Sequence, residues 1–417
     1  MEARVQSELT GQSELTGQSD LTLQTGLQAT WAEAAVRAGD EVRAADRWRE
    51  IRTLGGGGVR TTLPGGHVVV QFASNDYLGL SQHPAVRAAT VAAAEEWGTG
   101  SGASRLIVGS RPLHDELEAA LAVWKHAESA LLFASGYAAN VGVLGALARL
   151  GEAVGAPITI VSDELNHASI IDGSRLARVP VEVYAHADVD AATAAVERSA
   201  AAGRRAVIVT DSVFSMDGDV APLVDLAALA VASGSLLVVD DAHAVFAGEG
   251  ADALAGSPAE VLVVGTLSKA LGSLGGFVAG PAALVDWCRN TARSFIFSTA
   301  SPPTVVAAAL AALEIVQGDE GAALTERLRA NVDRLAVGHP SAVVPVVLGE
   351  ERRALDVSAA LLAAGLLVPA IRPPTVAPGA SRLRIAVSAS HSIDDVDALL
   401  DALDRLGVDL AAGTVAS

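Results

Sequence analysis

Lysine is scarce in this 417-residue chain, since only Lys125 and Lys269 stand among its 29 lysines and arginines. Arginine stays protonated in proteins, whereas a lysine can lose its proton and act as a base or form a Schiff base. Lys125 lies in AVWKHAES on a predicted amphipathic helix, which indicates a solvated surface charge. Lys269 follows an apolar run in VVGTLSKALGS and is flanked by hydroxyls and glycines, which indicates a chemical role.

Residues of particular types, most of them polar, follow several apolar runs. Together with Lys269, they are Gly136, Tyr137, His167, Asp240, His243, Thr266 and Ser268. A single aspartate in such a place is more often a helix cap or turn residue, and a single histidine is more often a structural group. As a set, these residue types have a chemical logic that none of them has alone.

That logic is the binding of an aldehyde cofactor such as pyridoxal 5'-phosphate (PLP). PLP needs a lysine for its Schiff base and a carboxylate that keeps its pyridine nitrogen protonated. Its phosphate needs hydroxyl donors and the N–H groups of a helix N-terminus, and a histidine ring can cover its face. The nucleotide-binding patterns fit poorly, because GTGSGAS lacks the GxGxxG spacing and GxxxxGK[ST] does not occur. No metal site is predicted.

Short β-branched runs between residues 66 and 300 alternate with Ala-rich segments of helical pattern. The predicted strands are 67–72, 130–133, 158–161, 181–184, 206–210, 236–240, 261–265 and 276–280. Several are apolar on both faces, which is typical of a mostly parallel sheet covered by helices on both sides. The pattern predicts an α/β domain, in which ligands bind at the carboxyl ends of the strands.

From about residue 311 the pattern changes to helix, strand, helix, strand, strand, helix, with a Pro-rich break at IRPPTVAPG. This change predicts a smaller α+β domain. The predicted organisation is a disordered tail (1–30), an N-terminal helical arm (31–65), a large cofactor-binding domain (66–310) and a small domain (311–417). The tail carries the polar near-repeat QSELTG, whose period is too short for a solenoid.

The bulk composition excludes some classes of partner. A net charge of −19 argues against nucleic acid or an anionic membrane, because both require a basic surface. The single cysteine, Cys288, cannot form an intrachain disulfide. The N-terminus lacks the basic region and the apolar core of a signal peptide, and no apolar stretch reaches a bilayer's thickness. These features predict a cytoplasmic protein.

A series of motifs identifies the family. In order they are SNDYLGLSQHPAV, GTGSGASRLIVGS, LHDELE, FASGYAANVG, DELNHASIIDG, DSVFSMDGDVAPL, DDAH, GTLSKALGSLGG and FIFSTASPP. Over residues 35–410 the chain resembles the α-oxoamine synthases, a branch of the fold-type I PLP enzymes. The resemblance implies a PLP-dependent transferase fold, with a mostly parallel seven-stranded sheet in the large domain, and a homodimer with shared active sites.

The resemblance also implies roles for individual residues. Lys269 carries the cofactor and then acts as the base, Asp240 pairs with the pyridinium nitrogen, and His243 lies near the phenolic oxygen. His167 stacks on the ring and Ser215 orients the cofactor. The groups around the phosphate are Gly136, Tyr137, Thr266, Ser268 and the neighbouring subunit's Ser298 and Thr299.

Substrate residues follow from the same resemblance. Arg384 of SRLRI clamps the carboxylate of the amino acid, with Asn75 lining the site and Thr375 close by. Arg49 of RWREIR is matched to the arginine that meets the acyl-CoA, and Arg47 and Arg52 are alternatives.

The segment AIRPPTVAPGASRLRIAVSASH is most similar to one branch of the family. That branch condenses L-alanine with pimeloyl-CoA, or with a pimeloyl carrier-protein thioester, in biotin biosynthesis. Glycine C-acetyltransferase, 5-aminolevulinate synthase and the enzymes that condense serine with long acyl-CoA share most of the site. Aminotransfer and a catalytically dead interaction protein are further alternatives, and the intact lysine, aspartate and histidines count against the last.

Two features depart from the family pattern. Phe246 in DDAHAVFAGEG stands where the family has glycine, and it either narrows the acyl channel or fills a gap in the core. The N-terminal extension with its QSELT near-repeats has no role in the family.

Overall fold

The computed structural model describes residues 30–410. The chain divides into two compact units, Met1–Glu50 and Ile51–Ser417, which are described separately. In the first, helix α1 (Trp31–Ala44) begins with a capping box: Thr30 Oγ1 accepts a hydrogen bond from Glu33 N at 3.2 Å, and the Glu33 carboxylate accepts one from Thr30 N at 2.8 Å. The predicted disordered tail lies almost wholly outside the described residues.

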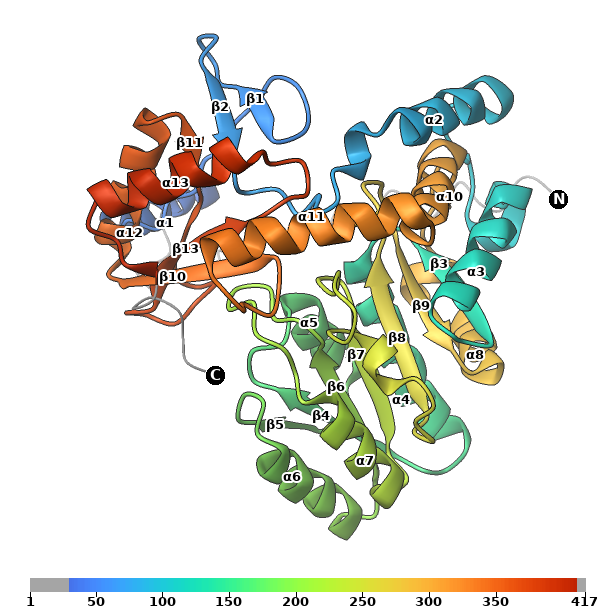
Figure 1. Cartoon of the computed structure of the whole chain (residues 1–417). Coiled ribbons are helices and arrows are strands. Elements are labelled where there is room, and N and C mark those ends of the chain that lie inside the picture. Colours follow the sequence, from blue (N-terminus) through green and yellow to red (C-terminus); the bar gives the residue numbers. More distant parts are fainter. Residues whose placement is uncertain (1–29, 411–417) are drawn as a thin grey trace, which may run out of the picture. The chain divides into compact units, whose positions relative to one another are not determined.

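The second unit is built on a seven-stranded sheet of order β3-β9-β8-β7-β6-β4-β5 (Figure 1). Its strands are β3 (Ser129–Phe133), β4 (Ile158–Asp163), β5 (Val181–Tyr184), β6 (Arg205–Asp211), β7 (Leu236–Asp240), β8 (Val261–Thr266) and β9 (Gly276–Gly280). Only β9 runs antiparallel to its neighbours, and the other pairs from β8 to β5 are parallel. The predicted seven-stranded, mostly parallel sheet is confirmed.

Helices cover both faces of this sheet because alternate strand residues are apolar on both sides. Val207 and Val209 pack in one core with α4, α5, α8 and α9, whereas Ile208, between them, packs in another with α6 and α7. These helices are α4 (Gly136–Ala153), α5 (Ala168–Ala177), α6 (Val189–Ala201), α7 (Leu223–Ser233), α8 (Ala282–Thr291) and α9 (Arg293–Ile296).

Two small sheets lie outside the large one. In the first, β2 (Val68–Gln71) pairs antiparallel with β1 (Arg60–Thr62) and parallel with β11 (Leu366–Leu367). In the second, β13 (Ser381–Ala386) pairs antiparallel with both β10 (Val343–Gly349) and β12 (Ala370–Ile371). The predicted strand at 67–72 therefore exists, but it pairs with a C-terminal strand and not with the seven-stranded sheet.

The remaining helices share the largest core cluster with these small sheets. They are α2 (Pro84–Trp97), α3 (Pro112–Trp124), α10 (Pro303–Val316), α11 (Asp319–Leu335), α12 (Glu351–Ala363) and α13 (Ile393–Arg405). Short single turns occur at Leu80–Gln82, Arg105–Gly109 and Ala251–Leu254. Figure 1 shows α11 running from α10 towards the β10–β13 sheet.

The C-terminal order of elements matches the predicted order, with three short strands, β11, β12 and β13, where two were predicted. The predicted domain boundaries at residues 65 and 310 stay predictions. Across residues 30–410 no helix is both long and apolar enough to cross a membrane.

Candidate active site

Lys269 lies in the turn after β8, and its amine meets a histidine from the turn after β7. Lys269 Nζ is 2.6 Å from Nε2 of His243. Burial lowers the pKa of Lys269 to about 8, although the negative charges of Asp240 and Asp211 act in the opposite direction. Burial, and then the positive charge of Lys269, lower the pKa of His243 well below its ordinary value. The pair therefore holds a proton on lysine that is easily lost near neutral pH.

A chain of hydrogen bonds continues from His243 into the structure. Tyr77 Oη is 2.6 Å from Nδ1 of His243, and it donates to Oδ1 of Asn75 at 3.2 Å. The same amide oxygen accepts a hydrogen bond from NH1 of Arg384 at 3.1 Å. Because the Tyr77 proton is given to Asn75, His243 donates from Nδ1 to the phenol and accepts from Lys269 at Nε2. Three side chains, those of His243, Tyr77 and Asn75, therefore connect the amine of Lys269 to the guanidinium of Arg384.

Arg384 is a buried cation, with 5% of its surface exposed. Its Nε donates to the carbonyl oxygen of Ser215. Arg382, two residues earlier on β13, forms an ion pair with Asp217. No carboxylate of residues 30–410 pairs with Arg384 in this way. Because a buried charge is normally paired, the remaining guanidinium N–H groups favour an anionic ligand.

Two carboxylates stand side by side at the carboxyl ends of β6 and β7, where Asp211 and Asp240 are in register. Asp240 Oδ1 accepts from Ala242 N at 2.9 Å, and Oδ2 accepts from Nδ2 of Asn140 at 2.6 Å. Burial raises the pKa of Asp211 well above its usual range, and the charge of Asp240 raises it further. The raised pKa of Asp211 favours the protonated form of that carboxyl group.

His167 is the N-cap of α5, next to these carboxylates. Its backbone N donates to Oδ2 of Asp211 at 3.0 Å, and its ring Nδ1 is 2.7 Å from Oγ of Ser169. Burial lowers the pKa of His167, while the charge of Asp240 raises it by a smaller amount. The ring is therefore present mainly as a neutral imidazole at neutral pH.

A group of donors suited to a phosphate lies where α4 begins. Ser135 caps α4 by accepting from Ala138 N at 3.1 Å, while the N–H groups of Gly136 and Tyr137 have no partner among the described residues. A Cβ on Gly136 would lie 3.4 Å from Cβ of Thr266, so the helix starts directly against the end of β8. Thr266 Oγ1 is 2.7 Å from Oγ of Ser268. Free N–H groups and paired hydroxyls are the donor set that a phosphate needs.

The structure does not bring every predicted site residue to this cluster. Ser215 joins it through its backbone oxygen. Ser298 and Thr299 follow α9, where Thr299 forms a strand bridge with Ser104, and they have no contact with Lys269 among the described contacts. Thr375 is exposed in the turn after Pro374. Arg49 belongs to the N-terminal unit, and its predicted role stays a prediction.

The predicted solvent exposure of Lys125 is wrong. Its Nζ donates to Oδ2 of Asp241 at 2.8 Å, with 12% of the lysine side chain and 1% of the aspartate side chain exposed. Lys125 follows the last turn of α3, and Asp241 also accepts from Ala251 N at 3.0 Å. Both lysines of the chain therefore contact the DDAH segment: Lys269 contacts His243, and Lys125 contacts Asp241.

Phe246 packs inside the protein, with 6% of its surface exposed. The guanidinium of Arg329 lies 3.4 Å above its ring centroid. Its backbone N donates to Oε2 of Glu249 at 3.0 Å. Burial raises the pKa of Glu249 to about 7. These contacts favour the core-filling alternative for Phe246.

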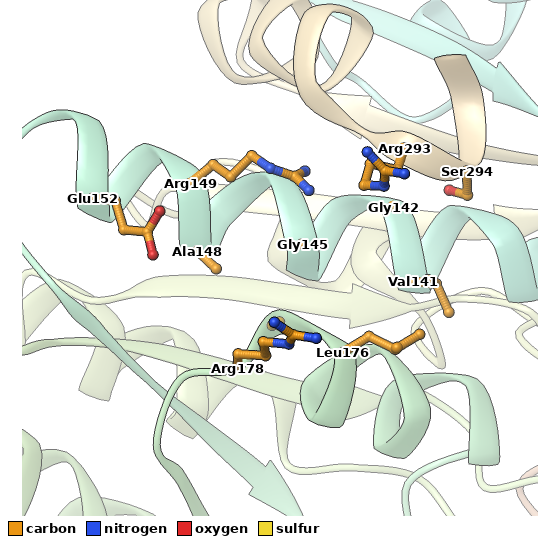
Figure 2. Close-up of a pocket in the computed structure, with 11 residues that line it drawn as sticks. Val141, Gly142, Gly145, Ala148, Arg149, Glu152, Leu176, Arg178, Arg293 and Ser294 are labelled. Atoms are coloured by element: carbon orange, nitrogen blue, oxygen red, sulfur yellow. The ribbon is translucent and has the colours of Figure 1, made fainter. Parts of the chain in front are cut away.

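A cavity of about 520 Å³ lies apart from this cluster, along α4, α5 and α9 (Figure 2). Figure 2 shows Arg149, Arg178 and Arg293 around the space beside Gly145. None of its lining residues is a predicted site residue. In residues 30–410, no group of three or more His, Cys, Asp or Glu side chains is arranged to hold a metal ion.

Sequence reasoning did not single out Tyr77, Asn140, Ser169 or Asp211. Each lies inside a motif quoted for the family resemblance, but no residue-level signal marked it. Tyr77 contacts a residue 166 positions away, Asn140 one that is 100 positions away, and Asp211 one that is 44 positions away. Only the fold therefore reveals these contacts.

Comparison with known proteins identifies the family of this chain. Residues 67–403 match the family model of class I and II aminotransferases. An 8-amino-7-oxononanoate synthase of Anaeromyxobacter dehalogenans is 48% identical over 359 residues, covering 83% of this chain and 88% of the relative. One of Geobacter sulfurreducens is 44% identical over 378 residues, covering 87% and 95%.

Solved structures agree. A serine palmitoyltransferase from S. paucimobilis with a bound PLP–myriocin aldimine has a TM-score of 0.81 at 27% identity, covering 91% of this chain and 98% of that chain. The 8-amino-7-oxononanoate synthase of Francisella tularensis has a TM-score of 0.66 at 23% identity, covering 81% and 98%, and supports the fold alone. The chain belongs to the class I and II aminotransferase family, within its α-oxoamine synthase group.

Proposed function

We propose that this protein is a PLP-dependent acyltransferase that condenses L-alanine with a pimeloyl thioester. The products are 8-amino-7-oxononanoate, CO₂ and the free thiol of the carrier, which is either CoA or a carrier protein. The reaction is that of biotin biosynthesis. Relatives named 8-amino-7-oxononanoate synthase, 42–48% identical to this chain over most of its length, support the choice of substrates.

The donor set fits PLP. Lys269 offers a deprotonatable amine, Asp240 offers a carboxylate for the pyridine nitrogen, and the start of α4 with Thr266 and Ser268 offers phosphate donors. When bound, PLP provides an electron sink for the pair of electrons left at the amino acid's Cα.

Lys269 is the proposed base for the Cα proton. An amine with a pKa of about 8 is partly neutral at physiological pH, so it can accept a proton and later return it. His243, whose pKa is lowered by burial, receives a hydrogen bond from the lysine and orients its amine. The Tyr77 hydroxyl in turn fixes the histidine ring.

The single observation that carries the proposal is that Arg384 is buried without a carboxylate partner among the described residues. Hydrogen bonds through Asn75, Tyr77 and His243 link its guanidinium to the amine of Lys269. A substrate carboxylate supplies the missing negative charge, and a guanidinium can bind it with two parallel hydrogen bonds. An α-amino acid held there by its carboxylate presents its Cα towards the lysine amine.

The acyl half of the reaction then follows from the chemistry at Cα. The Cα electron pair attacks the thioester carbonyl, and the C–S bond breaks to release the thiol. The alanine carboxylate leaves as CO₂, and Cα takes up a proton. Because each turnover releases one thiol, thiol release measures the condensation directly.

The substrate assignment is tested by measuring thiol release with each of L-alanine, glycine and L-serine. Each amino acid is combined with pimeloyl-, acetyl-, succinyl- and palmitoyl-CoA, and the product mass is determined. We expect kcat/KM to be highest for L-alanine with pimeloyl-CoA. Turnover confined to glycine with acetyl- or succinyl-CoA would instead assign the protein to another branch of the family. Amino transfer without thiol release would remove it from acyl transfer altogether.

We also propose a cytoplasmic homodimer with shared sites. Leu106, Ile107, Val108 and Phe297 are large apolar residues with about half or more of their surface exposed. The bridge between Ser104 and Thr299 brings the segments that carry them together. An exposed apolar cluster favours a second copy of the chain, and it lies beside the residues predicted to reach the partner's phosphate site. The one cysteine, Cys288, is buried and free, which fits a reducing compartment.

A further inference from the structure

Asn140 is the one polar side chain among the buried residues of α4, whose other buried residues are alanine, glycine, valine and leucine. Its Nδ2 donates to Oδ2 of Asp240 at 2.6 Å and to Oγ of Ser169 at 2.9 Å. Both amide protons are therefore used, one on a carboxylate and one on a hydroxyl. The amide group joins the end of β7 to the first turn of α5.

The contacts of Ser169 fix the tautomer of His167. Nδ1 of His167 accepts a hydrogen bond from the backbone N of Ser169 at 3.3 Å, so Nδ1 carries a lone pair and no proton. The hydroxyl of Ser169, which accepts from Asn140, is left free to donate to the same Nδ1 at 2.7 Å. The ring proton of the neutral imidazole therefore lies on Nε2.

Asp211 fixes the same residue from the backbone side, because its Oδ2 accepts from His167 N at 3.0 Å. Asp211 and Asp240 are neighbours in register. His167 is thus held twice: its backbone by Asp211 directly, and its ring by Asp240 through Asn140 and Ser169.

The amide oxygen of Asn140 is buried and has no hydrogen-bond partner. A buried polar atom without a partner is destabilising, and an apolar residue in α4 would avoid it. Asparagine at this position is therefore not explained by the stability of the helix. Its two donated hydrogen bonds to Asp240 and Ser169 are the explanation that the structure offers.

We infer that Asn140 and Ser169 are positioning residues for the cofactor: Asn140 orients the carboxylate that meets the pyridine nitrogen, and the two together fix the tautomer and the plane of the histidine ring that covers PLP. This inference rests on the proposed function, since it takes Asp240 and His167 as PLP contacts. The amide of Asn140 thus couples Asp240, at the edge of the PLP ring, to His167, on the face of that ring. Neither Asn140 nor Ser169 needs to touch the cofactor.

The test compares PLP dissociation constants and histidine NMR spectra of the wild type, Asn140→Ala, Asn140→Asp, Ser169→Ala and the Asn140→Ala/Ser169→Ala double variant. Asn140→Asp keeps the shape of the side chain but replaces the donor with an acceptor facing Asp240. We expect Asn140→Ala and Asn140→Asp each to weaken PLP binding by about tenfold or more, as loss of an outer-shell orienting group does in metal sites. Ser169→Ala should weaken it less.

The ¹⁵N shifts of His167 provide a readout that a purely structural role would not move. We expect a pyridine-type Nδ1 and a pyrrole-type Nε2 in the wild type, with mixed tautomers in Ser169→Ala and in Asn140→Ala. The His167→Gln variant assigns the signals. The two single effects on PLP affinity should be non-additive in the double variant, because both belong to one hydrogen-bond path.

Ser199→Ala is the matched control for Ser169→Ala. Ser199 is equally buried and donates to a backbone carbonyl, that of Arg204, in another part of the sheet's helical cover. It should lower the thermal midpoint without changing PLP affinity or the His167 signals. Unchanged PLP affinity and an unchanged His167 tautomer in folded Asn140→Asp would overturn the inference. Wild-type protein that does not bind PLP would overturn the proposed function instead.

Discussion

At the scale of the residue, the environment of each charged group decides what it can do. Arg382 and Arg384 have the same side chain, lie on the same strand and are both buried, yet only Arg382 has a carboxylate partner. Lys125 and Lys269 differ in the same way, because Lys125 forms an ion pair with Asp241, whereas Lys269 has no such partner in residues 30–410 and burial lowers its pKa. In each pair the residue without a direct acidic partner is the one assigned to the chemistry.

The two arginines give a matched test of the carboxylate clamp. We expect Arg384→Ala to raise the KM for alanine by about a hundredfold, because a charged hydrogen-bonded pair is worth about 1.5–3 kcal/mol. Arg382→Ala removes an equally buried guanidinium and should lower the thermal midpoint while leaving the alanine KM within about twofold. Steady-state kinetics and thermal unfolding of both variants check this. Equal effects of the two substitutions on KM would contradict the clamp.

Lys125→Met tests the ion pair that the sequence pattern concealed. Removal of the lysine leaves the carboxylate of Asp241 buried without its cation, so we expect the free energy of unfolding to fall by about 3 kcal/mol. Denaturant unfolding measures the change, and a double variant with Asp241→Asn should recover part of it. A change below about 0.5 kcal/mol would show that the pair is as weak as an exposed one.

At the scale of the element, the loop formed by residues 214–219 is held from both sides. On one side its backbone and Asp217 are bound by Arg384 and Arg382 of β13. On the other side His186 lies between the carboxylates of Asp163 and Asp219. Burial acts to lower the pKa of His186, but the hydrogen bonds to Asp163 and Asp219 outweigh it and raise the pKa to about 10.

The raised pKa of His186 predicts a dependence of stability on pH. Because the folded protein binds this proton more tightly than the unfolded chain, the stabilisation is fully present below pH about 6.5 and is lost as the pH rises through about 10. We expect His186→Gln to lower the thermal midpoint at pH 7 by about 3 °C. The difference from the wild type should shrink towards pH 10.5. Midpoints measured by calorimetry from pH 6 to 10.5 check this, and a difference that grows with pH would contradict the assigned charge.

Much of the large sheet could be predicted because its strands are apolar on both faces and so stand out as continuous runs. The strand at 67–72 was predicted too, but its partner β11 is almost 300 residues away, which no local pattern reveals. Lys269, the proposed catalytic lysine, follows a strand and Asp240 ends one, and both have rare or charged side chains. Asn140 and Ser169 resemble ordinary helix residues in the sequence, and their proposed role depends on contacts with each other and with Asp240 that form only in the folded protein.

At the scale of the whole molecule, the proposed homodimer divides each active site between two chains. Lys269 of one chain would act with the partner subunit's Ser298 and Thr299. A heterodimer of one chain that lacks Lys269 and one that lacks Ser298 and Thr299 then contains one site in which every part is intact. Such sharing distinguishes a functional dimer from two chains that merely associate.

Complementation between two variants tests this division. Lys269→Ala and Ser298→Ala/Thr299→Ala should each be strongly impaired as homodimers. A heterodimer of the two, isolated with different affinity tags, should recover about half of the wild-type thiol release, since one of its two sites is intact. Recovery no greater than the mean of the two parents would show that the sites are not shared.

The central claim is that Lys269 carries PLP, and the chain offers only one alternative, Lys125. The most direct measurement is reduction of the PLP-loaded protein with borohydride, which converts a Schiff base into a stable secondary amine, followed by digestion and mass spectrometry. We predict a phosphopyridoxyl group on Lys269, in the peptide that contains VVGTLSKALGS, and none on Lys125. A modified Lys125, or the absence of any modified lysine in protein that retains PLP, would contradict the account.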